Sequence, residues 1–242
     1  MRIVATIEAR MRSTRLPGKV LKPILGRPML ELMIERLGRV QQVDDVVIAT
    51  SDDPSCDPIE ELAVQLGVSC FRGSEEDVLD RVLKAGRQAQ ADVIVETTGD
   101  CPLIDPNVVD GIISIYLANG FDYVSTLQRT FPLGMDTQVF ATAVLEEVAR
   151  LTQDPVDREH VSLYIYEHPD RFSVHWVPSK LPEEYWGLRL VVDTPEDFAL
   201  MSAIYENLYP KNRMFSLQDV LDLFSRQPEL REINQHIKQR PV

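Results

Sequence analysis

The sequence contains few of the residues that build disulfide frameworks and metal centres. Its 242 residues include 3 cysteines and 4 histidines. No two cysteines form a C-x-x-C pair, and no two histidines form an H-x-x-x-H pair, which excludes a zinc-protease site. Since three cysteines cannot all pair with one another, we expect a reduced chain in the cytoplasm.

The short motifs of several large enzyme classes are also absent. There is no G-x-x-x-x-G-K-[ST], no G-x-S-x-G, no D-x-D, and no G-x-G-x-x-G after the first predicted strand. These absences disfavour a kinase, a hydrolase, a dehydrogenase and a nucleotide-sugar glycosyltransferase. No apolar run approaches the length of about 18 residues that a membrane-spanning helix needs, so we expect no such segment.

Positive charge is scarce in the chain as a whole but concentrated near its start. The 25 Lys and Arg residues face 38 Asp and Glu residues, which gives a net charge of -13 and excludes a basic nucleic-acid-binding surface. Residues 9–30 nevertheless contain no acidic residue. The cations of this segment are Arg10, Arg12, Arg15, Lys19, Lys22 and Arg27. A basic segment in so acidic a chain favours a local anion-binding site.

Short β-branched runs alternate with helical patterns along most of the chain. Strands are predicted at 3–7, 45–50, 92–98, 123–126 and 188–192, with helices at 29–38, 58–67, 75–90, 106–119 and 198–208. Strand-then-helix alternation predicts an α/β fold with a mainly parallel sheet covered on both faces. A chain of this length can bury roughly 70% of its surface, so we expect one domain over 1–242.

The alternation weakens between about 128 and 187. A strand running into a helix is expected at 138–148, another helix at 156–166 and an edge strand at 172–177. We interpret this stretch as an insertion in the single domain, and it is a candidate for contact with a partner.

The basic segment follows the first predicted strand directly. In open α/β sheets, ligands bind beyond the carboxyl ends of the strands. Arginine binds phosphate through two hydrogen bonds and lysine acts as a point charge. Residues 9–19 therefore suit a triphosphate, although a solvated basic loop is the alternative.

Two aspartates end other predicted strands and are candidate metal ligands. Asp100 follows the strand at 92–98, and Asp193 follows the strand at 188–192. Carboxylates at the ends of two strands could together hold Mg²⁺ over a triphosphate. Asp100 as a simple turn former is the alternative. Thr194 and Asp197 are expected to form a helix cap.

Further candidate positions lie between these blocks. Arg72 and Gly73 stand where a strand enters a helix, so Gly73 permits close approach of a ligand and Arg72 could face it. Arg81 is expected only to form a surface pair with Asp77. Arg158 belongs to a polar helix start whose use remains open.

Taken in order, these blocks resemble the cytidylyltransferases that make CMP-activated acidic sugars, such as CMP-Kdo and CMP-sialic acid synthetases, and most closely the SpsF-type spore-coat polysaccharide proteins. The segments that carry the resemblance are 9–21, 47–50, 72–81, 98–106, 132–140, 158–161 and 191–198. The resemblance implies a nucleotide-diphospho-sugar transferase-like (Rossmann-like) fold with a mixed, mainly parallel sheet flanked by helices. It also implies a homodimer, with its arm in the stretch at 128–187.

The resemblance further assigns residues to the transfer of CMP from CTP to a sugar, with pyrophosphate released. Residues that would bind the nucleotide are Arg10, Ser13, Arg15, Lys19, Arg72, Gly73 and Asp100. Lys19, Arg15 and Asp100 would be catalytic, and Asp100 and Asp193 would hold Mg²⁺. Residues that would meet the sugar are Pro102, Asp136, Arg158 and His160.

Two alternatives remain open at this point. The first is a sugar-1-phosphate nucleotidyltransferase that uses another nucleoside triphosphate, since residues 13–16 are partly similar to that family. The second is a nucleotide-binding module without turnover. The chain also departs from the branch pattern at Arg12, Leu133 and Thr137, and the changes at Leu133 and Thr137 bear on the sugar more than on the nucleotide.

Overall fold

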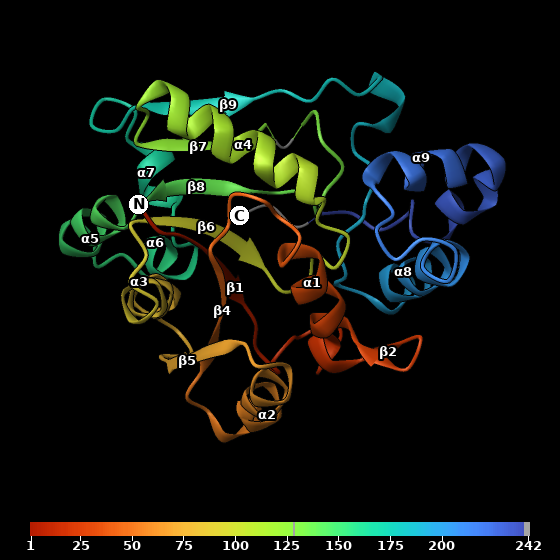
Figure 1. Ribbon diagram of the computed structural model, residues 1–242, viewed down its shortest axis with the longest axis horizontal. Helices are drawn as coiled ribbons and strands as arrows, with labels where there is room; N and C mark the ends of the chain where they lie inside the picture. Colours follow the sequence, from red (N-terminus) through yellow and green to blue (C-terminus); the bar gives the residue numbers. More distant parts are fainter. Residues whose placement is uncertain (128, 240–242) are drawn as a thin grey trace.

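A twisted seven-stranded sheet runs through the centre of the protein in the computed structural model, which describes residues 1–127 and 129–239 (Figure 1). Its strand order is β5-β4-β1-β6-β8-β7-β9. The strands are β1 (Ile3–Glu8), β4 (Asp45–Ser51), β5 (Ser69–Gly73), β6 (Val93–Thr98), β7 (Tyr123–Thr126), β8 (Gln138–Ala141) and β9 (Val174–Val177). β8 is antiparallel to both of its neighbours, while the other pairs are parallel. The predicted mixed, mainly parallel α/β sheet is confirmed.

Helices cover both faces of this sheet. They are α1 (Met29–Leu37), α2 (Asp57–Leu66), α3 (Val78–Gln88), α4 (Pro106–Asn119), α5 (Thr142–Leu151), α6 (Pro155–Glu159), α7 (Leu163–Glu167), α8 (Pro195–Leu208) and α9 (Leu217–Arg226). Alternate residues of β1 show the two faces, since Ile3 and Ile7 pack in the core under α1, α2 and α4, whereas Val4 packs under α3, α5 and α7.

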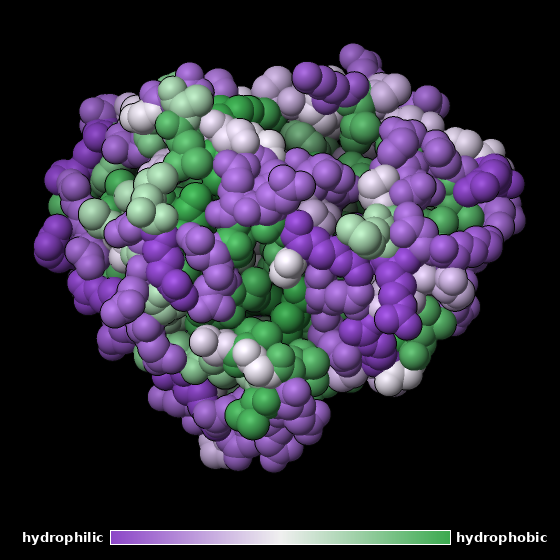
Figure 2. Space-filling model, in the orientation of Figure 1, coloured by the Kyte–Doolittle hydropathy of each residue, from purple (hydrophilic) through white to green (hydrophobic). Residues whose placement is uncertain are grey.

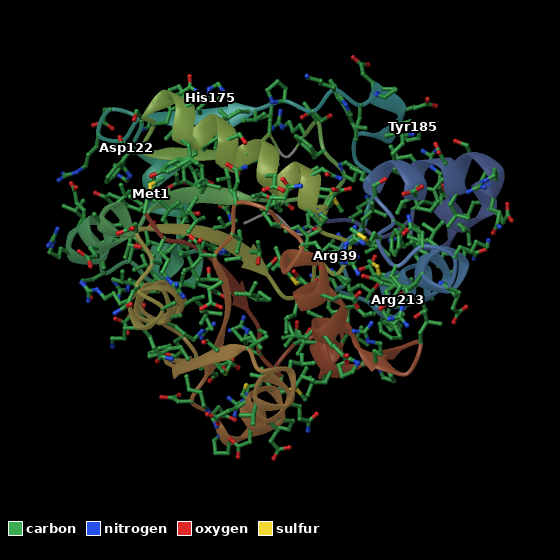
Figure 3. All side chains as sticks on the ribbon, in the orientation of Figure 1. Met1, Arg39, Asp122, His175, Tyr185 and Arg213 are labelled. Carbon is green, nitrogen blue, oxygen red and sulfur yellow. The ribbon has the colours of Figure 1, made fainter. Side chains whose placement is uncertain are left out.

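The last two helices form a separate apolar cluster beside α1. Tyr205 of α8 and Phe224 of α9 are buried in it together with Met29 of α1. Figures 1 and 3 show α8 and α9 beyond one end of the sheet, and Arg39 after α1 donates a hydrogen bond to the carbonyl of Arg213. The C-terminal helices thereby anchor the segment that precedes α8.

Short elements complete the chain. They are the 3-10 turns η1 (Lys19–Leu21), η2 (Pro54–Cys56), η3 (Glu183–Tyr185) and η4 (Pro228–Ile233) and the small hairpin β2 (Pro23–Ile24) and β3 (Arg27–Pro28). Within the described residues, no helix has the length and apolar character needed to cross a bilayer. The face seen in Figure 2 is mainly hydrophilic, with apolar side chains showing between the polar ones.

The strand predicted at 188–192 is wrong. This segment makes a single bridge, between Leu133 and Arg189, because its backbone bonds to a loop and not to a neighbouring strand. Leu190 N–H donates to the carbonyl of Leu133 at 2.9 Å, and Val192 N–H donates to the carbonyl of Asp100 at 2.8 Å. The segment is buried like a strand, so its sequence has the pattern of one.

Helix boundaries depart from prediction in two places. The helix expected at 75–90 begins at Val78, because Asp77 caps it by accepting a hydrogen bond from the N–H of Asp80. The helix expected at 156–166 is divided into α6 and α7, with Val161 at φ +47° between them. The strand-to-helix passage at 138–148 and the edge strand β9 are confirmed. Residue 128, at the start of the predicted insertion, lies outside the described residues.

Candidate active site

A polar cleft of about 420 Å³ opens at the carboxyl ends of β1 and β6. The basic loop after β1 forms one wall, and α3 together with the end of α6 forms another. The loop keeps its shape through its own backbone, since Gly18 N–H donates to the carbonyl of Met11 at 2.9 Å. The sequence-predicted residues on the cleft wall are Arg10, Ser13, Arg15, Lys19, Asp100, His160 and Asp193.

Lys19 joins the two predicted metal-ligand aspartates. Its Nζ donates to Asp100 Oδ2 at 3.0 Å, to Asp193 Oδ1 at 2.9 Å and to the carbonyl of Val192 at 2.8 Å. Burial alone would lower the pKa of Lys19, but the two carboxylates raise it above its ordinary value. Lys19 is therefore a fixed cation at the floor of the cleft.

Asp193 is held by cations on both of its oxygens. Arg15 and Arg189 approach Oδ2 at 2.9 and 2.7 Å, while Lys19 takes Oδ1. Burial would raise the pKa of Asp193, but these three cations keep it below its ordinary value. The carboxylate is thus ionised and bound in place.

The start of α8 fixes the backbone around Asp193. Thr194 and Asp197 form the predicted capping box, and Asp197 also accepts hydrogen bonds from Arg189 Nε at 2.9 Å and from the N–H of Asp193 at 3.0 Å. Arg189 is only 6% exposed. The capping box therefore fixes Asp193 as well as the start of α8.

Asp100 reaches the cleft because β1 and β6 approach closely at their ends. Gly99 N–H donates to the carbonyl of Glu8 at 2.8 Å, and a Cβ on Gly99 would stand 3.0 Å from that oxygen. Thr98 Oγ1 then donates to Asp100 Oδ1 at 2.7 Å. A glycine is required here for close strand packing, and the tight turn aims Asp100 at Lys19.

The remaining loop cations are only loosely held. Arg10 lies 3.4 Å from Glu75 and 3.6 Å from Glu159, and it is 40% exposed at its side chain. Arg12 lies 2.7 Å from Asp53. Exposed pairs of this kind contribute little to stability, so these guanidinium groups can turn toward an anion at low cost.

Arg72 and Gly73 stand apart from this cleft. Arg72 pairs with Asp57 at 2.7 Å and with Glu60 at 2.8 Å, both on α2. The carbonyl of Gly73 accepts a hydrogen bond from the N–H of Asp52 at 2.7 Å. Neither residue is on the wall of the 420 Å³ cleft.

The residues expected to meet the sugar are only partly brought together. His160 lines the cleft, whereas Arg158 forms an ion pair with Asp77 behind it. Asp136 is half-buried, and both burial and the charge of Asp100 raise its pKa. The carbonyl of Pro102 accepts a hydrogen bond from the hydroxyl of Tyr205 at 2.6 Å.

Glu8 and Arg81 on the cleft wall were missed by sequence reasoning. The expected surface pair between Arg81 and Asp77 is wrong, because Arg81 is 1% exposed and Asp77 pairs with Arg158. Arg81 is buried because it lies on the face of α3 that packs against the sheet, among Val78, Val82 and Ala85. A charged residue inside an apolar helical stripe was the available signal.

A second hollow of about 470 Å³ adjoins the other side of the basic loop. Met11 and Pro17 supply an apolar surface there, and Ser55 and Glu75 supply polar edges. A flat, partly apolar group suits this hollow better than it suits the charged cleft.

Known proteins resemble this chain over most of its length. Residues 4–225 match the cytidylyltransferase family. The spore coat polysaccharide biosynthesis protein SpsF of Bacillus subtilis is 35% identical over 94% of this chain and 95% of its own length. A cytidylyltransferase structure from Leptospira borgpetersenii superposes with a TM-score of 0.88, at 32% identity, over 100% of this chain and 99% of that one.

A more distant structure shows the fold alone. CMP:2-keto-3-deoxy-manno-octonic acid synthetase, solved in complex with CTP, has a TM-score of 0.66 at 20% identity and covers 86% of this chain and 99% of its own. The predicted nucleotide-diphospho-sugar transferase-like fold is thereby confirmed. Because the family match spans most of the chain, the protein belongs to the cytidylyltransferase family.

Proposed function

We propose that this enzyme transfers CMP from CTP to a sugar acid, with release of pyrophosphate, in the synthesis of a surface polysaccharide or glycan. The observation that carries the proposal is the bridge of Lys19 between Asp100 and Asp193, with Arg15 beside it. The relatives support the choice of substrates, since SpsF is a polysaccharide biosynthesis protein and the octonic acid synthetase binds CTP.

In this reaction a hydroxyl oxygen of the sugar forms a bond to the α-phosphorus of CTP. The bond from that phosphorus to the bridging oxygen of pyrophosphate breaks, and the hydroxyl proton leaves to water. The protein acts by positioning and by charge neutralisation. Lys19, Arg15 and Arg10 offset charge on the triphosphate and on the leaving pyrophosphate. No protein nucleophile is required.

Asp100 and Asp193 fit a divalent cation that arrives with the nucleotide, and we propose Mg²⁺. Both carboxylates lie within 3.0 Å of Lys19 Nζ, so an ion between them would take the place of this ammonium group, which would then turn to the triphosphate. No group of three or more His, Cys, Asp or Glu side chains among the described residues could hold an ion alone. Magnesium commonly binds through one or two carboxylates plus substrate phosphates, and when bound it neutralises charge on phosphate oxygens.

The sugar would lie on the α3 and α6 side of the cleft. His160 supplies a contact from the end of α6, and Arg158 supports that helix through its pair with Asp77. Asp136 and Pro102 are not on the cleft wall, although the charge of Asp100 acts on Asp136. Arg72 and Gly73 would approach the nucleotide from the neighbouring strand only if their surroundings rearrange.

The assembly follows from the same proposal. We infer a single domain that forms a homodimer through the stretch at 129–187, where β9 is an edge strand and Trp186 is 37% exposed. Light scattering behind size-exclusion chromatography would give a mass near twice 27.5 kDa. A cytoplasmic location remains a prediction.

The decisive experiment is a panel of reactions read by pyrophosphate release. CTP, UTP, GTP and ATP are each incubated with sugar acids, including 3-deoxy-manno-octulosonate and N-acetylneuraminate, and with sugar 1-phosphates. We expect turnover with CTP and a sugar acid. Turnover only with UTP or GTP would show that the cytidylyl assignment is wrong, and turnover only with a sugar 1-phosphate would replace the substrate class.

A variant separates catalysis from mere binding. Asp100→Asn should remove pyrophosphate release while CTP still binds, because the amide keeps the shape of the side chain and loses its charge. If the natural protein binds CTP but releases no pyrophosphate with any nucleotide or sugar of the panel, that result would instead favour the non-catalytic binding module.

A further inference from the structure

A half-buried glutamate, Glu8, and a buried one, Glu96, meet on one face of the sheet beneath the cleft. In the parallel pair of β1 and β6, Thr6 lies opposite Glu96 and Glu8 lies opposite Thr98. Because side chains alternate along a strand, Glu8 and Glu96 point to the same face, two positions apart on adjacent strands. This is the face covered by α3 and α7. The register thus places two carboxyl groups side by side.

Several polar atoms at this place have no hydrogen-bond partner within the part of the chain that the structure describes. They are Thr6 Oγ1, Glu8 Oε1, Arg81 Nε and Glu96 Oε2. Glu96 is 3% exposed and Arg81 is 1% exposed. Buried polar atoms are rarely left unpaired, since each costs on the order of 1–3 kcal/mol. A cluster of them next to a cleft therefore indicates a place where a polar ligand binds.

The two carboxyl groups differ in what surrounds them. Glu8 and Arg81 both line the cleft, whereas Glu96 lies deeper and does not. Beside Glu96, Gln138 is already engaged, because its Oε1 accepts hydrogen bonds from Tyr123 and Ser162 at 2.7 Å each. Glu8 is the member of the pair that a ligand can reach.

Charge decides which kind of group would bind. The two carboxyl groups lie side by side, and burial together with the charge of Glu8 on Glu96 favours a shared proton against the opposing charges of Arg81 and Arg10. Burial raises the pKa of Glu8 to about 7 and raises that of Glu96 as well. An added anion would be repelled by this pair. A hydroxyl or amino group, which donates a hydrogen bond, suits the Glu8 oxygen that does not take part in the shared proton.

We propose that Glu8 is a specificity-determining contact for the sugar, accepting a hydrogen bond from a hydroxyl or amino substituent remote from the reacting centre, and that Glu96 is the positioning residue behind it. The inference rests on the proposed function and adds a substrate contact to it. The cytosine ring is assigned elsewhere, because the hollow beside Met11 and Pro17 offers it an apolar surface.

The test compares Glu8→Gln with the natural protein as full chains. With the best sugar acid of the panel, we expect the KM for the sugar to rise about tenfold, as for loss of one hydrogen bond to the substrate. The Kd for CTP should stay within about twofold, since the loop cations are intact. Glu76→Gln makes the same chemical change at an exposed position of the β5–α3 loop and serves as the control.

A second pair of variants tests the positioning residue. Glu96→Ala should raise the KM for the sugar, and Glu96→Gln should restore most of it, because an amide supplies the hydrogen that the carboxyl pair shares. A purely structural defect would change the Kd for CTP as well. An unchanged sugar KM in Glu8→Gln, or an equal loss of CTP affinity, would overturn the inference.

A separate readout distinguishes this inference from the proposed function. If the natural protein releases no pyrophosphate with any sugar acid, the proposed function fails. Side-chain ¹³C labelling of glutamate, with the Glu8 signal assigned by its absence from Glu8→Gln, then reports binding directly. A shift of that signal on adding 3-deoxy-manno-octulosonate or N-acetylneuraminate supports the contact, and no shift with either sugar refutes it.

Discussion

At the scale of single residues, Lys19 concentrates the charge of the site. It lies between two carboxylates and a carbonyl, and it is the only loop lysine in the cleft wall among the described residues. Arg15 beside it is already paired with Asp193. A triphosphate arriving in the cleft would therefore compete with Asp100 and Asp193 for the ammonium group.

Replacing Lys19 by methionine should lower kcat/KM for CTP by about 10²- to 10³-fold. The reason is that a preorganised cation next to the developing pyrophosphate charge contributes on the order of 3–4 kcal/mol to transition-state stabilisation. Pyrophosphate release at varied CTP gives the value. Lys22→Met is the matched control, since Lys22 lies over the ring of Phe198 outside the cleft, 5.2 Å from its centroid. Equal losses in the two variants would contradict the assignment.

At the scale of elements, the segment at 188–192 shows how a loop can position a catalytic group. Gly134 lies against it with φ +95°, a backbone conformation that favours glycine. A Cβ at Gly134 would stand 2.5 Å from the carbonyl oxygen of Leu190, a backbone atom that cannot move aside as a flexible side chain could. The backbone at Gly134 thus sets the path of the chain toward Asp193.

Gly134→Ala should destabilise the protein by about 2–4 kcal/mol and raise the KM for CTP at the same time. Strain at a positive φ and the clash with Leu190 both displace the segment that carries Asp193. Urea unfolding and pyrophosphate release measure the two effects.

The comparison variant for this change is Gly120→Ala. Gly120 ends α4 with φ +68° and has open space around its Cβ position. Its substitution should cost about 1 kcal/mol of stability and leave the KM for CTP unchanged. A Gly134→Ala variant that is destabilised without any change in KM would show that the segment does not position Asp193.

The same segment marks the limit of prediction from sequence. Short runs of β-branched and other apolar residues predict β1, β4, β6 and β7 correctly, because those runs are buried in a sheet. Residues 188–192 have an equally apolar pattern, but they bury it against Leu133 and the C-terminal helices, and no local pattern distinguishes these surroundings. Burial is readable in the sequence, whereas the partner of a buried segment is not.

At the scale of the whole molecule, the net charge of -13 hides how charges pair. Position after a strand was enough to predict that the basic loop and Asp100 share a sheet edge, and the structure joins Lys19 to Asp100. Asp193 joins them as well, although the strand predicted before it is absent. The pairing of Glu8 with Glu96 depends on β1–β6 register across 88 residues of sequence, which no motif encodes. Long-range register is the part of the site that needed the structure.

This buried pair should make the stability of the protein depend on pH. The pKa of Glu8 is raised in the folded protein to about 7, so the folded state retains a proton that the unfolded chain loses near its ordinary value of 4.5. Stability from this group is therefore complete below about pH 4.5 and is lost as the pH rises to about 7. The positive charges of Arg81 and Arg10 lower the pKa of Glu8 and so oppose this shift. The negative charge of Asp100 raises the pKa, as burial does, and Glu96 shares the proton through a hydrogen bond.

Glu8→Gln removes this titration, so the variant should gain stability relative to the natural protein as the pH rises from 5 to 8. The change in the difference should be about 2–3 kcal/mol, since each pKa unit corresponds to about 1.4 kcal/mol. Urea unfolding of both proteins at several pH values measures it, and groups that titrate alike in the two proteins cancel. Glu76→Gln should show a constant difference. A constant difference for Glu8→Gln as well would mean that the pKa of Glu8 is not raised in the folded protein.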